Sequence, residues 1–326
     1  MQINKIKYIL LILFLFGNIV LPQAGDLQSE SVMPKDAEAL AELDGQFTFM
    51  IVSDLGRNGY YDQKPVAEMM GVVTRITDLE FVAALGDIHH FRGVQSVEDP
   101  LWLTNYELIY KHPELMLPWY PLMGNHEYEG NTQAVIDYSK VSRRWDMPAR
   151  YYSKTFKAAI DTEVLLLWID TPRLIDKYRN NPDEWADAQL QSIEEELEWL
   201  ESTLENSDAK WKIVMGHHPV YGGTYKSDSE RGDLQERLQP ILDAYNVDIS
   251  IGGHLHNFQH IQVEVSDIDY FVNTSASQTR KVDPIKGQLF GSSDSGFTLC
   301  TVKDNELIVT FVNKEGKIIY RYSRKK

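Results

Sequence analysis

The chain has 326 residues, of which 43% are hydrophobic, enough for the core of one large domain or two modest ones. Its formal net charge of −16 at pH 7 repels the phosphate backbone of nucleic acids, so general DNA or RNA binding is disfavoured. The only cysteine, Cys300, excludes an intramolecular disulfide, so the core, with any bound metal, must stabilise the fold.

The first 24 residues have the pattern of a secretory signal peptide. Lys5 and Lys7 precede an apolar stretch over residues 8–21, and small residues suited to cleavage follow it. The stretch is short for a membrane span, and an uncleaved N-terminal anchor is the alternative interpretation. Cleavage removes two lysines and no acid, which takes the net charge from −16 to −18. We expect an exported protein, periplasmic or secreted, with no stable membrane span after cleavage.

An alternation of strands and helices begins after a polar segment. Residues 25–45 have no strand pattern and are interpreted as a linker or N-terminal arm, followed by a catalytic domain over residues 46–326. Most of the short apolar runs that follow end on Asp, Asn or His near Gly. These runs read FTFMIVSD, LEFVAALGD, LPWYPLMGN, TEVLLLWID, WKIVMGHH and VDISIGGH. Helical stretches between several of them predict an α/β domain with its ligands at the carboxyl ends of the strands.

The clearest predicted helix covers residues 187–204. Leucine and isoleucine recur there at steps of three and four residues, at Leu190, Ile193, Leu197, Leu200 and Leu204. We expect the acidic run between these residues, together with Trp199, on the solvated outer face. The end of the chain instead predicts strands with little helix between them, and residues 314–317 form a hairpin turn.

Metal-binding side chains gather at the predicted strand ends. They are Asp54 in SDLG, Asp87 in GDIHH, Asn125 and His126 in GNHE, His217 in GHHP, and His254 and His256 in GGHLHN. A single carboxylate would be explained as a cap, but five clusters of oxygen and imidazole donors are not. Two metal ions held close together need a bridging carboxylate, further donors on each side and open positions for water and substrate.

These motifs resemble the calcineurin-type metallophosphoesterases, and within them the small purple acid phosphatases of the tartrate-resistant type. The resemblance runs from about Phe47 to the C-terminus and includes FRGVQSVED, PWYPLMGNHEYEGN and YSKVSRRWDMPARYY. It implies an α/β fold, a two-sheet sandwich flanked by helices, and a phosphoric ester hydrolase. It also implies two metal sites that share Asp87. The implied ligands are Asp54, Asp87 and His256 for the first metal, and Asp87, Asn125, His217 and His254 for the second.

One position departs from the purple enzymes. The residue three after the bridging aspartate is a metal-binding tyrosine in that family, whereas here it is His90. Many relatives outside the purple group supply a histidine two residues after the first aspartate, but this chain has Gly56 there. We hypothesise that His90 supplies a nitrogen donor to the first metal and that His89 points elsewhere. The alternative is that both are loop residues and the first metal is under-coordinated or absent.

This substitution predicts a different pair of metals. A neutral imidazole in place of a phenolate removes a negative charge and weakens the preference for a trivalent ion. We therefore expect two divalent ions, zinc, manganese or ferrous iron, and no ferric–tyrosinate centre. Divalent ions acidify bound water less than ferric iron does, so the activity optimum should lie nearer neutral or alkaline pH than in the acid phosphatases.

The resemblance also implies a mechanism. A metal-bound hydroxide attacks phosphorus in line, and the two cations neutralise charge on the equatorial oxygens. In the family His126 is positioned to contact a phosphate oxygen or to assist the leaving group, and we expect Glu127 to orient it. Asn125 and His218 are further candidate substrate contacts, although His218 is equally compatible with packing. A further outer-sphere histidine of the purple enzymes, soon after GHHP, is missing here.

Three functions are compatible with these residues. The first is an exported phosphatase that hydrolyses small phosphomonoesters. The second is a phosphodiesterase or nucleotide hydrolase with the same metal site, and residues 57–63 and 222–232 would shape its cleft. The third is a catalytically silent binding protein, which would be expected to have lost ligands. The sequence does not determine the oligomeric state.

Overall fold

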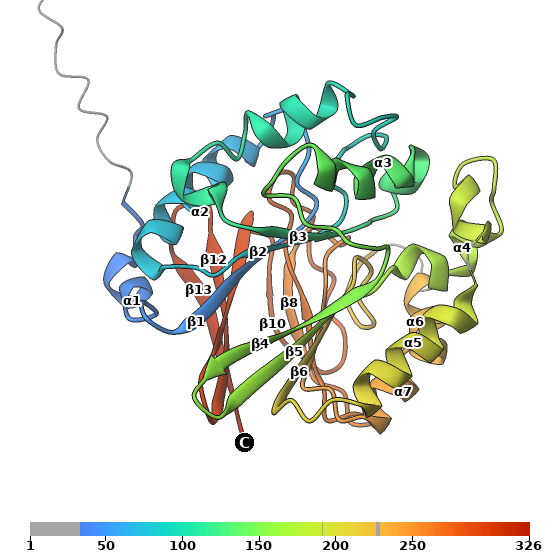
Figure 1. Ribbon diagram of the computed structural model, residues 1–326. Coiled ribbons are helices and arrows are strands. Elements are labelled where there is room, and N and C mark those ends of the chain that lie inside the picture. The colour runs from blue at the N-terminus through green and yellow to red at the C-terminus, as the bar shows by residue number, and fades with distance from the viewer. Residues whose placement is uncertain (1–32, 191, 226–228) are drawn as a thin grey trace, which may run out of the picture. The chain divides into compact units, whose positions relative to one another are not determined.

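In this computed structural model, which describes residues 33–190, 192–225 and 229–326, the chain forms two mixed β-sheets flanked by helices (Figure 1). The strands are β1 (Phe47–Val52), β2 (Val82–Leu85), β3 (Trp119–Leu122), β4 (Tyr152–Ala159), β5 (Thr162–Trp168), β6 (Trp211–Met215), β7 (Ile249–Gly252), β8 (Phe258–Ile261), β9 (Asp269–Val272), β10 (Gln288–Ser292), β11 (Gly296–Val302), β12 (Glu306–Asn313) and β13 (Ile318–Lys325). The α-helices are α1 (Ala37–Ala41), α2 (Gln63–Thr77), α3 (Thr132–Asp137), α4 (Asp176–Arg179), α5 (Ile193–Glu205), α6 (Ser229–Arg237) and α7 (Gln239–Ala244). The short helical turns are η1 (Leu103–Glu107), η2 (Pro113–Met116), η3 (Glu127–Glu129), η4 (Tyr138–Lys140), η5 (Thr171–Leu174) and η6 (Ala186–Leu190).

The parallel strands are neighbours within each sheet. One sheet has six strands in the order β13-β12-β11-β1-β2-β3, and the other has seven in the order β10-β8-β9-β7-β6-β5-β4. β1, β2 and β3 are parallel, as are β5, β6, β7 and β9. α1 and α2 lie outside the first sheet, and α5, α6 and α7 lie outside the second (Figure 1). The expected α/β sandwich of two sheets flanked by helices is confirmed.

The sequences of the parallel strands reflect burial on both faces of each strand. β2 and β7 are buried at every residue, and β1 is buried at all but its first. A strand that packs against a helix on one face and the other sheet on the opposite face needs apolar side chains on both, which explains continuous runs such as FTFMIV. The predicted C-terminal hairpin is also present, since β12 and β13 pair on either side of residues 314–317.

The acidic residues of α5 do not all lie on the solvated outer face, where they were expected. Leu200 and Leu204 are buried, as the periodicity predicts. The predicted start of the helix is wrong, because Leu190 ends the separate turn η6 and is 71% exposed, and α5 begins at Ile193. Glu196, however, is fully buried rather than solvated: its carboxylate accepts a 2.7 Å hydrogen bond from the Asp170 backbone N–H and lies 3.4 Å from the Arg173 guanidinium. Burial, with repulsion from the Asp170 carboxylate, raises the pKa of Glu196 to about 8. Trp199 is half-buried and packs against the core.

The described residues begin just before α1. Leu40 and Leu43 are buried, and the backbone N–H groups of Lys35 and Asp36 donate to carbonyls in the turn between β12 and β13. The predicted signal peptide and the start of the predicted arm lie outside the described residues. Within the part of the chain that the structure describes, no helix is both long enough and apolar enough to cross a membrane.

The inward face of α5 can be tested with a pair of leucines. Leu204→Ala removes a fully buried side chain and should lower the free energy of unfolding by about 2 to 5 kcal/mol. Leu190→Ala is the matched control because this leucine is 71% exposed, and it should change the same quantity by less than about 0.5 kcal/mol. Both are measured by urea denaturation. Equal losses in the two variants would contradict this orientation.

Candidate metal centre

Strands of both sheets deliver polar side chains to one place. Asp54 follows β1 and Asp87 follows β2 in the first sheet, while His217 follows β6 and His254 follows β7 in the second. Two hydrogen bonds join the sheets there: the His254 backbone N–H donates to Asp54 Oδ2 at 3.0 Å, and His217 Nδ1 lies 2.7 Å from the Leu85 carbonyl oxygen. The carboxyl ends of parallel strands from two sheets therefore meet in one site.

The side chains at this junction form groups that are compact enough to hold metal ions. Each group offers one ligand atom per residue, and these atoms lie within 4.8 Å of one another. Within the described residues four such groups share members, and they are Asp54 with His90 and His256, Asp54 with Asp87 and His217, Asp87 with His90 and His126, and His217 with His218 and His254. The overlap through two aspartates is what a pair of neighbouring cations needs.

Asp87 lies between the two halves of the site. Its Oδ1 accepts a 3.0 Å hydrogen bond from the His126 backbone N–H, which fixes the plane of the carboxylate. Its Oδ2 faces His217 Nε2 at 3.2 Å and His90 Nε2 at 3.5 Å. One oxygen thus points toward donors from both halves, which is the geometry of a bridging carboxylate.

Backbone carbonyls orient three of the histidines in the same way. The Nδ1 atoms of His90, His217 and His256 lie 3.1, 2.7 and 2.5 Å from the carbonyl oxygens of Gly56, Leu85 and Gln278. A carbonyl can only accept, so each Nδ1 carries a proton and each Nε2 is the ring atom turned toward the site, where its lone pair would bind a cation. These Nε2 atoms face the aspartates, with His256 Nε2 at 2.9 Å from Asp54 Oδ1.

His254 is oriented in the opposite sense. Its Nε2 lies 3.1 Å from Glu230 Oε2, and its Nδ1 lies 3.3 Å from His217 Nε2. His254 therefore presents Nδ1 to the site, with the Glu230 carboxylate behind it. Sequence analysis missed Glu230 because α6, which carries it, is far from the strand ends in sequence.

Buried atoms without partners test whether metals fit. Within the described residues, Asp54 Oδ1, His90 Nε2 and Asn125 Oδ1 are buried and have no hydrogen-bond partner. Leaving a buried polar atom unpaired costs about 1 to 3 kcal/mol, so three of them in one place need an explanation. All three are oxygen or imidazole donors aimed at the same site, and bound cations would satisfy them together. The residues therefore fit a dinuclear centre.

The ligand loops adopt backbone conformations that most residues avoid. Asp54, Asp87, His254 and His256 have φ values of 52°, 50°, 62° and 57°, in the left-handed region. Asp and His tolerate this region better than most side chains, but each such residue still costs energy. Gly124 permits a close approach to the carboxylate, since a Cβ there would lie 2.2 Å from Asp87 Oδ1.

Charges in the site shift several pKa values. Burial lowers the pKa of His90 to about 4 despite the nearby Asp87, which keeps its imidazole neutral. Burial would also lower the pKa of His217, but attraction to Asp87 outweighs it and raises that pKa to about 9. Burial and repulsion from Asp87 raise the pKa of Glu127 to about 7.

Comparison with known proteins identifies the family. The family described as calcineurin-like phosphoesterase matches residues 47–258. The chain belongs to this family. Purple acid phosphatase 4 of Arabidopsis thaliana is 30% identical over 300 residues, which cover 87% of this chain and 85% of that relative. Tartrate-resistant acid phosphatase type 5 of Rattus norvegicus is 32% identical over 279 residues, 79% of this chain and 82% of the relative.

Solved structures agree on the fold. The structure described as GAP50, the anchor in the inner membrane complex of Plasmodium, covers 86% of this chain and 89% of its own, with a TM-score of 0.74 and 23% identity. Purple acid phosphatase PPD1 from yellow lupin covers 86% of this chain and 54% of its own, with a TM-score of 0.61 and 14% identity. The predicted resemblance is confirmed, and this calcineurin-like phosphoesterase is a hydrolase of phosphate esters.

Gly56 and His90 form one unit in this phosphoesterase. A Cβ at Gly56 would lie 1.9 Å from the Ile88 carbonyl oxygen, so no side chain fits there without moving the backbone. The Gly56 carbonyl instead accepts from His90 Nδ1, and the backbone N–H of His90 donates to the same oxygen at 3.3 Å. The missing histidine at position 56 and the added one at position 90 are thus structurally linked. His89 lies outside these groups and packs edge-on against Trp102.

His126 has a different orienting partner from the one expected. Its Nδ1 lies 2.8 Å from Glu129 Oε1, whereas the Glu127 carboxylate is buried and accepts from the backbone N–H groups of Asp87, Ile88, His89 and Gly124. Glu127 thus holds the ligand loops, and Glu129 faces the imidazole. The spacing of three residues within a helical turn was the signal for Glu129.

His218 has no ring nitrogen left for a substrate. Its Nδ1 lies 3.0 Å from the Thr171 hydroxyl, and its Nε2 lies 2.8 Å from the Tyr178 hydroxyl. The ring is buried and packs against that of His254, with 4.3 Å between centroids. This geometry favours the packing alternative over the predicted substrate contact.

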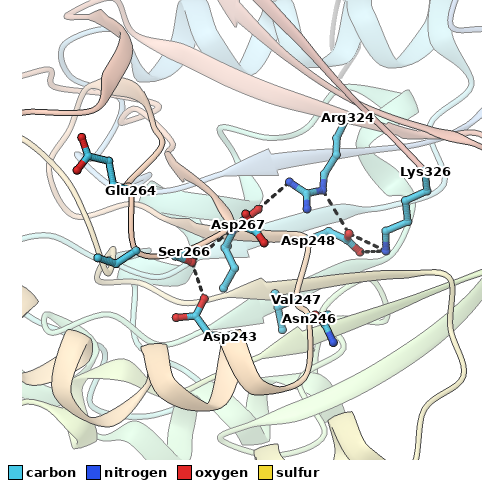
Figure 2. Close-up of a pocket in the computed structure, with 11 residues that line it drawn as sticks. Asp243, Asn246, Val247, Asp248, Glu264, Ser266, Asp267, Arg324 and Lys326 are labelled. Carbon is cyan, nitrogen blue, oxygen red and sulfur yellow. Dashed lines mark hydrogen bonds and ion pairs between the residues drawn. The ribbon is translucent and has the colours of Figure 1, made fainter.

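One large cavity lies away from the metal centre. Its volume is about 540 Å³, and Figure 2 shows Arg324 and Lys326 beside Asp248 in its wall. Asp248 precedes β7 while His254 follows it, so the cavity is at the opposite edge of the sheet. Its polar groups bond to one another, with Lys326 Nζ 2.7 Å from Asp248 and Ser266 Oγ 2.5 Å from Asp243.

The role of His90 can be measured by metal content. Elemental analysis of the purified protein should give about two metal ions per chain, and His90→Ala should reduce this toward one, because it removes a donor facing Asp54 and Asp87. His89→Ala is the matched control, since this neighbouring buried histidine lies outside the groups. Two ions per chain in His90→Ala would mean that His90 is not a ligand.

Proposed function

We propose that this phosphoesterase is an exported phosphatase that hydrolyses small phosphomonoesters with two divalent metal ions. The observation that carries the proposal is the overlap of two donor groups through Asp87, whose Oδ2 faces His217 and His90. Export is supported by the pattern of residues 1–24 alone, which lie outside the described part of the chain. The monoester substrate is supported by the names of the relatives, which are acid phosphatases.

The proposed division of metal ligands is the one that the family resemblance implies, with His90 added to the first ion. Asp54, His90 and His256 would hold the first ion, Asn125, His217 and His254 the second, and Asp87 both. When bound, two such cations acidify water and neutralise charge on a phosphoryl group. The protein supplies the rest by fixing donor positions before the substrate arrives, through backbone carbonyls behind the imidazoles and amides around the carboxylates.

His126 is the proposed proton donor to the leaving oxygen. Its side chain is 23% exposed, whereas that of Asp87 is 2% exposed, so His126 lies at the mouth of the site. Its Nδ1 faces Glu129, and its Nε2 lies 3.9 Å from Asp87 Oδ2. This arrangement holds the ring with Nε2 next to the bridging position, where a phosphate ester would bind.

A catalytically silent binding protein is the third candidate, and the geometry of the site is against it. The structural neighbour described as an anchor shares the fold, but at 23% identity this likeness carries no functional assignment. The predicted donors lie together here and leave three buried atoms without partners, and a protein that had lost metal binding would have no reason to keep these. A phosphodiesterase using the same centre remains the alternative activity, and an aryl phosphodiester assayed beside an aryl phosphate distinguishes the two.

His126→Ala should lower kcat by about 10²-fold to 10⁴-fold, the usual range for a general acid, and leave two metal ions per chain. Glu129→Ala should lower kcat less and leave KM unchanged, because it removes only the group that orients the ring, and Glu129→Gln should restore part of the loss. Steady-state kinetics on an aryl phosphate, with elemental analysis, measure both. Full activity in His126→Ala would remove this residue from the mechanism.

The proposed divalent ions predict a colourless protein. His90 stands where the purple enzymes have a tyrosine, so no phenolate is available at that position for charge transfer to ferric iron. Freshly purified protein should show no iron–tyrosinate band in its visible spectrum, and elemental analysis should find zinc, manganese or iron. A purple sample would contradict the divalent assignment without affecting the phosphatase assignment.

A further inference from the structure

A second cavity opens directly beside the first half of the metal centre. Its volume is about 400 Å³, and it is lined by Arg57, Asn58, Tyr60, Tyr61, His90 and Phe91. His90 is a wall of this cavity and also a member of the group with Asp54 and His256. A molecule in the cavity would therefore lie next to whatever binds at the metals.

Three aromatic rings at this cavity are exposed to solvent. Tyr60, Tyr61 and Phe91 are 71%, 60% and 73% exposed, and they come from two separate loops. Exposed aromatic side chains gathered around one cavity are unusual on a protein surface and mark a binding site more often than chance. Aromatic rings bind planar ligands by stacking, at little cost in side-chain entropy.

The loop that carries the tyrosines is fixed before any ligand binds. The fully buried Gln63 accepts hydrogen bonds through Oε1 from the backbone N–H groups of Arg57 and Gly59, at 3.0 and 2.7 Å. Tyr61 has a φ of 54°, a conformation that bulky residues rarely adopt. Strain of this kind at an exposed side chain serves no packing purpose, and it is typical of binding sites.

Arg57 adds a positive charge to the wall of this cavity. Its side chain is buried, yet Nε has no hydrogen-bond partner, and the described residues offer its guanidinium no ion pair. It lies over the ring of Phe91, at 4.9 Å from the centroid, and the Asp54 and Asp87 carboxylates of the metal centre attract its charge. In a chain with a net charge of −16, a guanidinium beside the metal centre that forms no ion pair within the described residues is suited to an anionic oxygen.

We infer that this cavity is a leaving-group subsite for phosphate esters whose alcohol carries a planar aromatic ring. Tyr60, Tyr61 and Phe91 stack on the ring, and Arg57 donates to an oxygen of the phosphate. This inference rests on the proposed function, because it places the phosphate at the metals. It names the substrate class of the same site, either aryl phosphates or nucleoside phosphates.

Binding of unreactive phosphonates tests the subsite without turnover. Isothermal titration calorimetry compares phenylphosphonate with methylphosphonate, which lacks the ring, on the metal-loaded protein. Stacking should make phenylphosphonate bind about tenfold more tightly. The double variant Tyr60→Ala/Tyr61→Ala, and separately Phe91→Leu, should bring this ratio toward one. Because these side chains are mostly exposed, their replacement leaves the core intact.

Two further variants separate the parts of the subsite. Arg57→Met should weaken both phosphonates by a similar factor and Arg57→Lys should do so less, because the charge acts on the group that they share. Ile160→Ala is the control: this exposed residue lies in the turn before β5, at the opposite end of the strands from the centre, and should leave the ratio unchanged. Equal affinities in the natural chain, or a ratio unaffected by the aromatic variants, would overturn the subsite.

Hydrolysis assays identify the source of the ring and separate this inference from the proposed function. A preference for adenosine monophosphate over ribose 5-phosphate assigns nucleoside phosphates, and a preference confined to phenyl phosphate over glycerol 2-phosphate assigns simple aryl esters. Turnover with neither preference would overturn the subsite and leave the phosphatase standing. Selective phenylphosphonate binding without turnover of any monoester would support the subsite and overturn the proposed phosphatase activity.

Discussion

The metal centre depends on the buried carboxylate of Glu127. Its two oxygens accept four backbone hydrogen bonds, from Asp87, Ile88, His89 and Gly124, at 2.7 to 3.2 Å. Each of these N–H groups would otherwise be buried without a partner at the end of a strand, at a cost of about 1 to 3 kcal/mol. One side chain therefore ties the loop after β2 to the loop after β3. This tie places Asp87, the proposed bridging ligand, next to Asn125 and gives the two halves of the site a common support.

The strand-end donors were predictable from sequence because two simple rules place them. Parallel strands bury both faces, so their sequences are apolar runs, and their carboxyl ends share one edge, so the residues that follow them meet. Asp54, Asp87, His217, His254 and His256 satisfy both rules. Strands β8 and β10 satisfy neither. β8 buries Gln259 and His260, which are satisfied by groups far away in sequence, including Gly223 and Tyr320. No local pattern predicts those partners.

The groups behind the ligands were also beyond sequence analysis. Glu230 reaches His254 from α6, and Gln63 holds the loop of Arg57 from the first residue of α2. The burial of Glu196 has the same origin, since Arg173 and the Asp170 backbone give its carboxylate partners that α5 itself lacks. Helical periodicity identifies the face that packs against the sheet, but it cannot identify a polar residue whose partners lie on another element.

His90 stands where the purple enzymes have a tyrosine, and the proposed divalent metals would keep the net charge of the centre unchanged. A phenolate replaced by a neutral imidazole removes one negative charge from the ligands, and a trivalent ion replaced by a divalent one removes one positive charge. Under the proposed assignment, the net charge of the loaded centre is therefore the same as in the purple enzymes, and its attraction for an anionic phosphate is preserved. The Gly56 carbonyl completes the exchange, because it fixes the proton on His90 Nδ1 and leaves Nε2 as a neutral donor. Under this assignment a trivalent ion would lack the phenolate that compensates its extra charge, which is why we propose divalent metals for this site.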